Sequence, residues 1–407
     1  MNITKKRWSV LIANCIINLC IGSLYAWSVF SGPLASKISA ITGQEITSLA
    51  LVFSLANSVG PITMISGGIL NAKLGSKKII IFGGIMFSAG MILTGLAKSV
   101  NVLYLTYGLL VGLGVGFVYG NTVSNSVKFF PDKRGFAGGV ATASYGLSSV
   151  IIPIIANKLM SFMDVTKCFL ILGTAMFILI IGASFFVFTC PADYVIDGYV
   201  RPEVSNSSTK SNDKNWKEML KDPIFYIMIA MLLCGAFGGM MITSQASPIA
   251  QRMIGMTASQ AALAVSVLAL FNTGGRIVAG SISDKIGVPN TILGVFAISI
   301  IGQLLLFMSG MGTVTIFFIG VCIAGLCFGS IMGVYAGFTA EQFGAKNNGI
   351  NYGIMFIGFA VAGYFGPAIA SNLYASSGTY KYAFVVAMGL SVVGIILDLL
   401  YKKATRK

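Results

Sequence analysis

Twelve apolar segments, separated by polar or Gly/Pro-containing turns, constrain the fold of this chain more than any other feature. They lie near residues 8–34, 46–70, 79–97, 101–127, 135–160, 167–189, 223–248, 258–282, 289–309, 313–340, 350–374 and 379–401. Each is long enough to cross the ~30 Å hydrocarbon core of a bilayer as a helix. Only 10% of the residues are charged, against ~25% in a typical soluble domain. We therefore predict an all-α integral membrane protein with twelve transmembrane helices.

The distribution of basic residues predicts the orientation in the membrane. If the N-terminus is inside, the inner loops and tails hold 20 of the 27 Lys and Arg residues, and the outer loops hold 6. Such a bias is typical of cytoplasmic loops and explains the net charge of +15 without a nucleic-acid partner. We predict a multi-pass protein of the cell (plasma) membrane, surrounded by lipid, with both termini in the cytoplasm and no bound nucleic acid.

The longest polar stretch, residues 190–222, is rich in Ser, Asn, Lys and Asp. This composition is typical of a flexible linker. We therefore predict an N-terminal six-helix half over residues 1–189, a cytoplasmic linker loop over 190–222, and a C-terminal six-helix half over 223–407.

The two predicted halves resemble each other at nearly constant spacing. Gly68 and Gly280 are 212 residues apart, and Pro33 and Pro248 are 215 apart. A constant offset across a chain indicates a duplicated unit. Two six-helix repeats in parallel orientation are the plan of the major facilitator fold, in which the ligand binds near the membrane midplane.

The eighth apolar segment contains one arginine, Arg276, eight residues before Asp284 at the predicted membrane edge. At 1.5 Å per residue this position is ~12 Å inside the span. A cation there costs roughly 2.5–3.5 kcal/mol, so it should face a polar cavity rather than lipid. The sequence offers no obvious permanent partner. The structural alternative is that Arg276 binds a backbone carbonyl or a helix end and only ties helices together.

A loop motif of glycine, then aspartate and a basic residue, then glycine, follows the eighth segment as Gly280, Asp284, Lys285 and Gly287. Its copy after the second segment keeps Gly68, Lys73 and Gly75 but has Ala72 in place of the aspartate and Ser76 where a basic residue or proline is usual. This motif resembles the conformational-switch loop of the major facilitator superfamily. The stretches LYAWSVFSGP (24–33), FPDKRGFAGG (130–139), LFNTGGRIVAGSISDKIG (270–287) and NYGIMF (351–356) resemble, within it, the oxalate:formate antiporter family.

This resemblance implies a carrier of small organic anions that works by alternating access, with Arg276 at the position of the substrate-binding arginine. The oxalate transporter of that family has a second cation, a lysine, where this chain has Phe359, and polar aromatics where it has Phe328 and Met332. One cavity cation matches a monoanion, since a unit charge pair ~4 Å apart is worth about 4 kcal/mol at an effective dielectric of ~20. A monocarboxylate such as formate, lactate or pyruvate is thus favoured over a dicarboxylate such as oxalate.

Aromatic and amide side chains supply the other candidates for substrate binding, each of which plain helix packing would explain equally well. They are Tyr25, Tyr119, Tyr145, Asn272, Phe328, Tyr335, Phe356 and Phe359. Tyr25 and Tyr119 match aromatic positions of the family's pocket, whereas Tyr145 is chosen for its location alone.

The spans lack the residue types that couple transport to protons or catalyse reactions. The chain has no histidine, and its twelve acids fall in loops or near predicted span ends. Gly275 stands where related monocarboxylate–proton symporters commonly carry an aspartate. Since proton relays use embedded acids or histidines, exchange or uniport is favoured over proton symport. The chain shows no motif for an enzyme, a metal or a cofactor, and we expect a monomer. The alternative function is export of uncharged solutes or drugs, with Arg276 structural.

Overall fold

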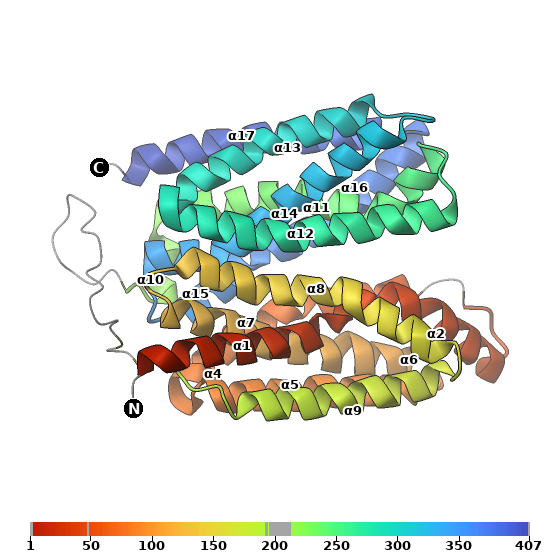
Figure 1. The fold of residues 1–407 in the computed structure, drawn as a ribbon, viewed down its shortest axis with the longest axis horizontal. Helices are drawn as coiled ribbons and strands as arrows, with labels where there is room; N and C mark the ends of the chain where they lie inside the picture. The colour runs from red at the N-terminus through yellow and green to blue at the C-terminus, as the bar shows by residue number, and fades with distance from the viewer. Residues whose placement is uncertain (1–2, 47–48, 192–193, 195–212, 406–407) are drawn as a thin grey trace. The chain divides into compact units, whose positions relative to one another are not determined.

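A computed structural model describes residues 3–46, 49–191, 194 and 213–405. Within these residues the regular secondary structure is entirely helical, and twelve helical stretches are long and apolar enough to cross a membrane. Figure 1 shows the long helices lying side by side in each part of the chain. The predicted fold class, an all-α protein with twelve membrane spans, is therefore confirmed.

The chain forms two packing units. Unit 1 comprises Met1–Pro131, Ser144–Ser208 and Lys346–Ile354. Its elements, beside part of α8 (Arg134–Met160), are α1 (Ile3–Ile21), η1 (Gly22–Ala26), α2 (Trp27–Thr42), α3 (Ala50–Ser58), α4 (Gly60–Leu74), α5 (Ser76–Gly95), α6 (Val100–Leu103), η2 (Tyr104–Val111), α7 (Gly112–Phe129), α9 (Val165–Ser184) and α15 (Asn348–Met355). Helix α7 packs against α1, α4 and α5, and α9 packs against α1 and α5.

Unit 2 comprises Asp132–Ala143, Thr209–Ala345 and Met355–Lys407. Its elements are α10 (Trp216–Lys221), α11 (Pro223–Arg252), α12 (Ala258–Ile286), α13 (Val288–Met308), α14 (Val314–Phe343), α16 (Ile357–Ser377) and α17 (Lys381–Thr405). Helix α14 packs against α12 and α13, and α11 packs against α16 and α17. These contacts place α12, which carries Arg276, directly against α14.

Helix α8 (Arg134–Met160) belongs to both units, because its residues up to Ala143 pack in unit 2 and those from Ser144 pack in unit 1. The units thus follow packing rather than chain order, and the division into halves at 190–222 stays a prediction. Residues 192–193 and 195–212 of that predicted linker lie outside the described residues. Its last part contains α10, which begins with a capping box formed by Asn215 and Glu218.

The first span differs from its prediction, because the helix continues past Pro33 to Thr42 instead of ending near residue 34. A proline inside a membrane helix is tolerated when neighbouring groups satisfy the freed backbone. The same span changes to a 3₁₀ helix over Gly22–Ala26. Gly22 explains the close packing there, since a Cβ would come within 3.0 Å of the backbone at Tyr145.

Equivalent positions of the two predicted repeats have the same backbone conformation. Gly75, between α4 and α5, has φ 80° and ψ 154°, and Gly287, between α12 and α13, has φ 83° and ψ 150°. Only glycine adopts this region without strain. The two residues are 212 positions apart, which is the offset that Gly68 and Gly280 show.

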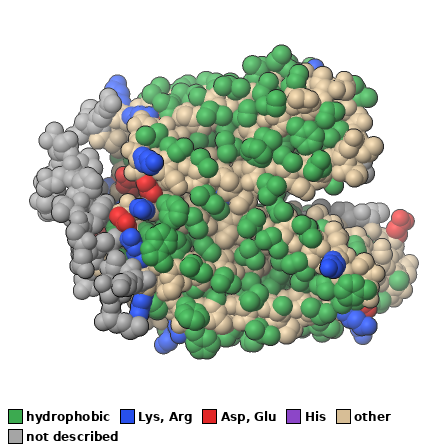
Figure 2. Space-filling view, in the orientation of Figure 1, with side chains coloured by type: hydrophobic (Ala, Val, Ile, Leu, Met, Phe, Trp, Pro, Cys, Tyr) green, Lys and Arg blue, Asp and Glu red, His purple; other side chains and the backbone are tan. Residues whose placement is uncertain are grey.

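Exposed hydrophobic side chains are numerous on the helices, for example Leu51, Phe185 and Ile301, each more than half exposed. Figure 2 shows hydrophobic side chains along the length of the helices, with Lys, Arg, Asp and Glu near helix ends. A surface of this kind is stable only in contact with lipid.

Candidate substrate-binding site

Arg276 lies in α12, a helix of 29 residues with well-defined ends. Thr257 and Gln260 form a capping box at its start, and Gly287 ends it with a positive φ angle. The helix is apolar enough to span a membrane. Within it, Arg276 is only 3% exposed. The structure therefore places this cation inside the protein rather than against lipid.

Two groups of unit 2 bind the guanidinium. Its Nε donates to Asn272 Oδ1 (3.1 Å), one turn earlier in α12, and its Nη1 donates to the Thr142 carbonyl oxygen of α8 (2.6 Å). Among the described residues, no Asp or Glu forms an ion pair with Arg276. Because a guanidinium has five N–H donors, three remain for a ligand. The Thr142 contact also agrees with the structural alternative, so the role of Arg276 stays a prediction.

Glycines bring the neighbouring helices close to the backbone at Arg276. A Cβ on Gly333 of α14 would lie 2.5 Å from the Arg276 carbonyl oxygen, and one on Gly139 of α8 would also meet that oxygen at less than 3.0 Å. Gly329, one turn before Gly333, makes the same close approach to Asn272. Helix α12 is thus held between α14 and α8 at the level of Arg276.

The other predicted residues of unit 2 form an aromatic group on α14 and α16. The rings of Phe328 and Phe359 are stacked with centroids 6.5 Å apart, and Phe356 packs on Phe359 at 4.6 Å. Phe328 is adjacent to Gly329, which contacts Asn272, so it lies about one turn from the level of Arg276. Tyr335 contributes no free hydroxyl, because it donates to the Met228 carbonyl (3.0 Å).

In unit 1, the structure brings together the three predicted tyrosines. Tyr145 of α8 packs edge-on against Tyr25 of η1, with ring centroids 5.3 Å apart, and against Tyr119 of α7 at 5.0 Å. The 3₁₀ segment and the close packing of Gly22 on α8 bring Tyr25 to this position. Their role in substrate binding stays a prediction.

The loop motif after α12 contacts the first turn of α8. Asp284 Oδ1 accepts from the backbone N–H of Gly135 (2.7 Å), and Oδ2 accepts from that of Phe136 (2.8 Å). A carboxylate at a helix N-terminus is stabilised by the unpaired N–H groups and the helix dipole. Gly280, one turn before Asp284, packs against the Gly135 backbone without room for a Cβ.

The first copy of the motif has the same backbone approach without the carboxylate. Gly68 of α4 packs against the backbone of Gly349 and Ile350 at the start of α15. Ala72, at the position equivalent to Asp284, cannot accept a hydrogen bond through its side chain. Lys73 and Lys285 are both exposed at the ends of their helices.

One acid lies deeper than the sequence predicts. Helix α17 extends to Thr405 rather than ending near 401, and Asp398, which lies in both the predicted and the observed helix, is fully buried. Its Oδ2 lies 2.8 Å from Lys402 Nζ. Asp398 thus lies near the end of its span, as predicted, but its full burial was not predicted.

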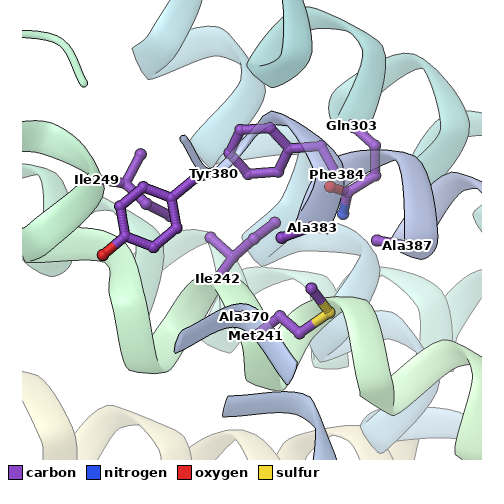
Figure 3. A pocket seen from close by; sticks show the side chains of 9 residues that line it. All are labelled: Met241, Ile242, Ile249, Gln303, Ala370, Tyr380, Ala383, Phe384 and Ala387. Carbon is purple, nitrogen blue, oxygen red and sulfur yellow. The ribbon is translucent and has the colours of Figure 1, made fainter. Parts of the chain in front are cut away.

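A small cavity of about 10 Å³ lies between helices of unit 2, away from Arg276. Nearly all its walls are apolar, and Gln303 contributes an amide there (Figure 3). Gln303 is 2% exposed, and its Oε1 accepts no hydrogen bond. The cavity is too small for an organic anion, since about this volume is needed for a single water molecule. It is not a candidate substrate site.

The residues that sequence reasoning missed are the backbone groups around Arg276. The Thr142 carbonyl has no side-chain signature. The glycines of α14 do have one, because Gly325, Gly329, Gly333 and Gly337 recur every four residues, as close packing along one helix face requires.

Twelve membrane-spanning helices, one of which buries an arginine without an acidic partner among the described residues, are consistent with a membrane transporter. The Major Facilitator Superfamily matches residues 15–357 and 254–407 of this sequence. The chain belongs to the major facilitator superfamily, and it is a transporter rather than an enzyme.

Relatives and a solved structure agree with this assignment. The chain is 31% identical over 363 residues to the uncharacterized MFS-type transporter YhjX of Escherichia coli, covering 88% of this chain and 86% of YhjX. It is 30% identical over 396 residues to the oxalate:formate antiporter of Oxalobacter formigenes, covering 96% and 90%. The fold is similar to that of the human organic anion transporter MFSD10, with a TM-score of 0.73, 13% identity and coverage of 98% and 100%.

Proposed function

We propose that this protein is a secondary transporter that exchanges small organic anions by alternating access. Its preferred substrate is a monocarboxylate of the formate, lactate or pyruvate class. The observation that carries the proposal is Arg276. Its guanidinium is buried in a membrane-spanning helix, has no acidic partner among the described residues, and retains three N–H donors. A planar guanidinium binds a carboxylate through two parallel hydrogen bonds.

The charge of the site favours a single carboxylate. Phe328 of α14, about one turn from the level of Arg276, and Phe359, which stacks on it, are apolar, and the Tyr335 hydroxyl is already bound to Met228. A dianion would keep one charge without a partner in this environment. At ~4 Å and an effective dielectric of ~20, the missing pair is worth about 4 kcal/mol.

The similarity to the oxalate:formate antiporter supports an anion as substrate, because that relative spans nearly the whole chain. Its name includes a dicarboxylate and a monocarboxylate, so the two classes must be compared directly. By analogy with this family we also propose that the chain resides in the plasma membrane, works as a monomer and has both termini in the cytoplasm.

The contacts of α12 with α8 give the proposal a mechanism. Asp284 holds the first turn of α8, Gly280 packs on Gly135, and Arg276 binds Thr142 two turns further along α8. A carboxylate competes with the Thr142 carbonyl only if it takes the one Nη1 N–H that this carbonyl now accepts, rather than the three remaining donors. We propose that substrate binding removes this contact, so that α8 and α12 separate more easily during the transport cycle.

Counterflow in proteoliposomes tests the proposal. Vesicles are preloaded with formate, oxalate, lactate, pyruvate or acetate, and uptake of the labelled anion is compared for wild type, Arg276→Gln and Arg276→Lys. Lys37→Gln is the matched control, because Lys37 is also a cation in a membrane helix but binds the Gly95 carbonyl and Thr166 Oγ1 (both 2.7 Å). We expect monocarboxylate exchange that is lost in Arg276→Gln and retained in Lys37→Gln.

Two results would contradict the proposal. Preference for oxalate over all monoanions would refute the single-cation argument and support dicarboxylate exchange. Anion exchange that persists in Arg276→Gln would make this residue structural.

A further inference from the structure

Arg252, at the C-terminal end of α11, is held by two tyrosines at the end of unit 2 where α16 ends and α17 begins. Its side chain is exposed, and Cζ lies 5.2 Å from the centre of the Tyr374 ring. The Tyr374 and Tyr380 rings are stacked with centroids 4.4 Å apart, and the Tyr380 hydroxyl interacts with the guanidinium. A cation over an aromatic face is stabilised while its N–H edge stays available.

An amide network fixes the tyrosine pair. The Tyr380 hydroxyl donates to Gln245 Oε1 (3.2 Å), and Gln245 Nε2 donates to Ser371 Oγ (3.1 Å). Gln245 lies two turns before Arg252 in α11, Ser371 is in α16, and Tyr380 directly precedes α17. Three segments therefore orient the rings that hold the guanidinium.

This end of unit 2 carries positive charge without described acids. Arg252 has no ion-pair partner among the described residues, and Lys381 lies at the same end. The described acids of unit 2 all lie toward the opposite end, where α11 begins and α12, α14 and α17 end: Asp132, Asp213, Glu218, Asp222, Asp284, Glu341 and Asp398. The potential at the Arg252 end is therefore attractive to anions.

We propose that Arg252, Tyr374, Tyr380 and Gln245 form a capture site for the carboxylate of the transported anion, which binds there before it reaches Arg276. This inference rests on the proposed function. Arg252 is 13 residues, or ~20 Å, further along α11 than Gly239, which packs against Phe328. Because this exceeds the ~8 Å Debye length at physiological salt, Arg252 acts as a separate site rather than as a second ligand at Arg276.

The test measures initial exchange rates against substrate concentration at low and physiological ionic strength, in vesicles of zwitterionic phosphatidylcholine. Wild type is compared with Arg252→Gln, Arg252→Lys and Lys381→Gln. The last is a matched control, because Lys381 lies at the same end over Phe307 (5.5 Å) without a tyrosine pair. Thermal unfolding of each purified variant identifies loss of folded protein.

We expect Arg252→Gln to raise the apparent KM about threefold to tenfold at low salt, with the maximal rate unchanged, since steering acts on association. The KM of wild type should rise with salt, that of Arg252→Gln should not, and Arg252→Lys should recover part of the effect. Lys381→Gln should change the apparent KM less than Arg252→Gln does.

Equal KM values and equal salt dependence in wild type and Arg252→Gln would overturn the capture site alone. An effect of Arg252→Gln that appears only when anionic phosphatidylglycerol is added would also overturn it and assign the site to a lipid phosphate. If wild type exchanges no organic anion, the proposed function itself fails.

Discussion

Gly333→Ala perturbs the placement of Arg276 without changing any polar group. A Cβ at this position of α14 would lie 2.5 Å from the Arg276 carbonyl oxygen and 2.7 Å from its Cα. Ordinary contact begins at 3.4 Å, so α12 and α14 must separate by about 0.9 Å. Gly139 of α8 packs on the same carbonyl from another side and leaves little room for α12 to move.

This displacement is large on the scale of the site. If α12 moves, Arg276 is displaced by up to about 0.9 Å relative to α14 and to the Thr142 carbonyl that its Nη1 binds. If α14 moves instead, the position of Arg276 relative to Phe328 changes by the same amount. A displaced guanidinium forms a weaker hydrogen bond to the carboxylate. Because one charge-assisted hydrogen bond contributes about 1.5–3 kcal/mol, we expect anion affinity to fall roughly 10-fold to 100-fold.

The assay is the half-saturating concentration for monocarboxylate counterflow, measured together with thermal unfolding in detergent. Gly325→Ala is the matched control, because its Cβ would lie 2.7 Å from the Leu268 carbonyl and separate the same two helices two turns away from Gly333. Gly274→Ala, with nothing within 4 Å, should change little. Equal loss of affinity in Gly325→Ala and Gly333→Ala would refute the reasoning, since general helix packing would then explain the effect.

Three further substitutions test other contacts by thermal unfolding in detergent. Asp284→Asn should lower stability by about 1–2 kcal/mol, because the charged acceptor at the α8 N-terminus is lost; an unchanged midpoint would show that this end of α8 needs no carboxylate. Gln303→Leu should raise stability by about 1–2 kcal/mol, because it removes a buried acceptor without a partner, and a lower midpoint would indicate that a bound water satisfies the amide. Lys402→Met should lower the free energy of unfolding by about 3–5 kcal/mol, because it leaves Asp398 buried without its partner. Adding Asp398→Asn should recover part of this loss. No recovery would assign Lys402 a different role.

The sequence predicts the span number and the repeat well, because both depend on hydrophobic length and on glycines that the turns require. The predicted end of the first span is wrong, because a proline commonly ends a helix, whereas Pro33 lies within α2. The prediction also ends the last span about four residues too early, because the basic and polar residues after 401 belong to the last turn of α17 rather than to a loop.

The site is predictable to the level of residue types. Arg276 is identified because a single cation in an apolar helix is costly. Tyr25 and Tyr119 follow from the resemblance, whereas Tyr145 follows from its location alone. The partners of Arg276 cannot be predicted in the same way. The Thr142 carbonyl is a backbone atom, and its approach depends on the packing of α8 against α12, which no single segment encodes. The hydrogen bond that the Tyr335 hydroxyl donates likewise depends on the Met228 carbonyl, which lies in another helix.

The membership of residues Lys346–Ile354 in unit 1 has a consequence for biosynthesis. Gly68 of α4 contacts Gly349 and Ile350, so this face of unit 1 is incomplete until the ribosome has passed residue 354. The interval from Ser208 to Lys346 takes roughly 7–30 s at about 5–20 residues per second. During that time Gly68 of α4 lacks the backbone of Gly349 and Ile350 against which it packs in the folded protein. The N-terminal half expressed alone should therefore be a poor folding unit, and co-expression with a segment that contains α15 should improve its yield.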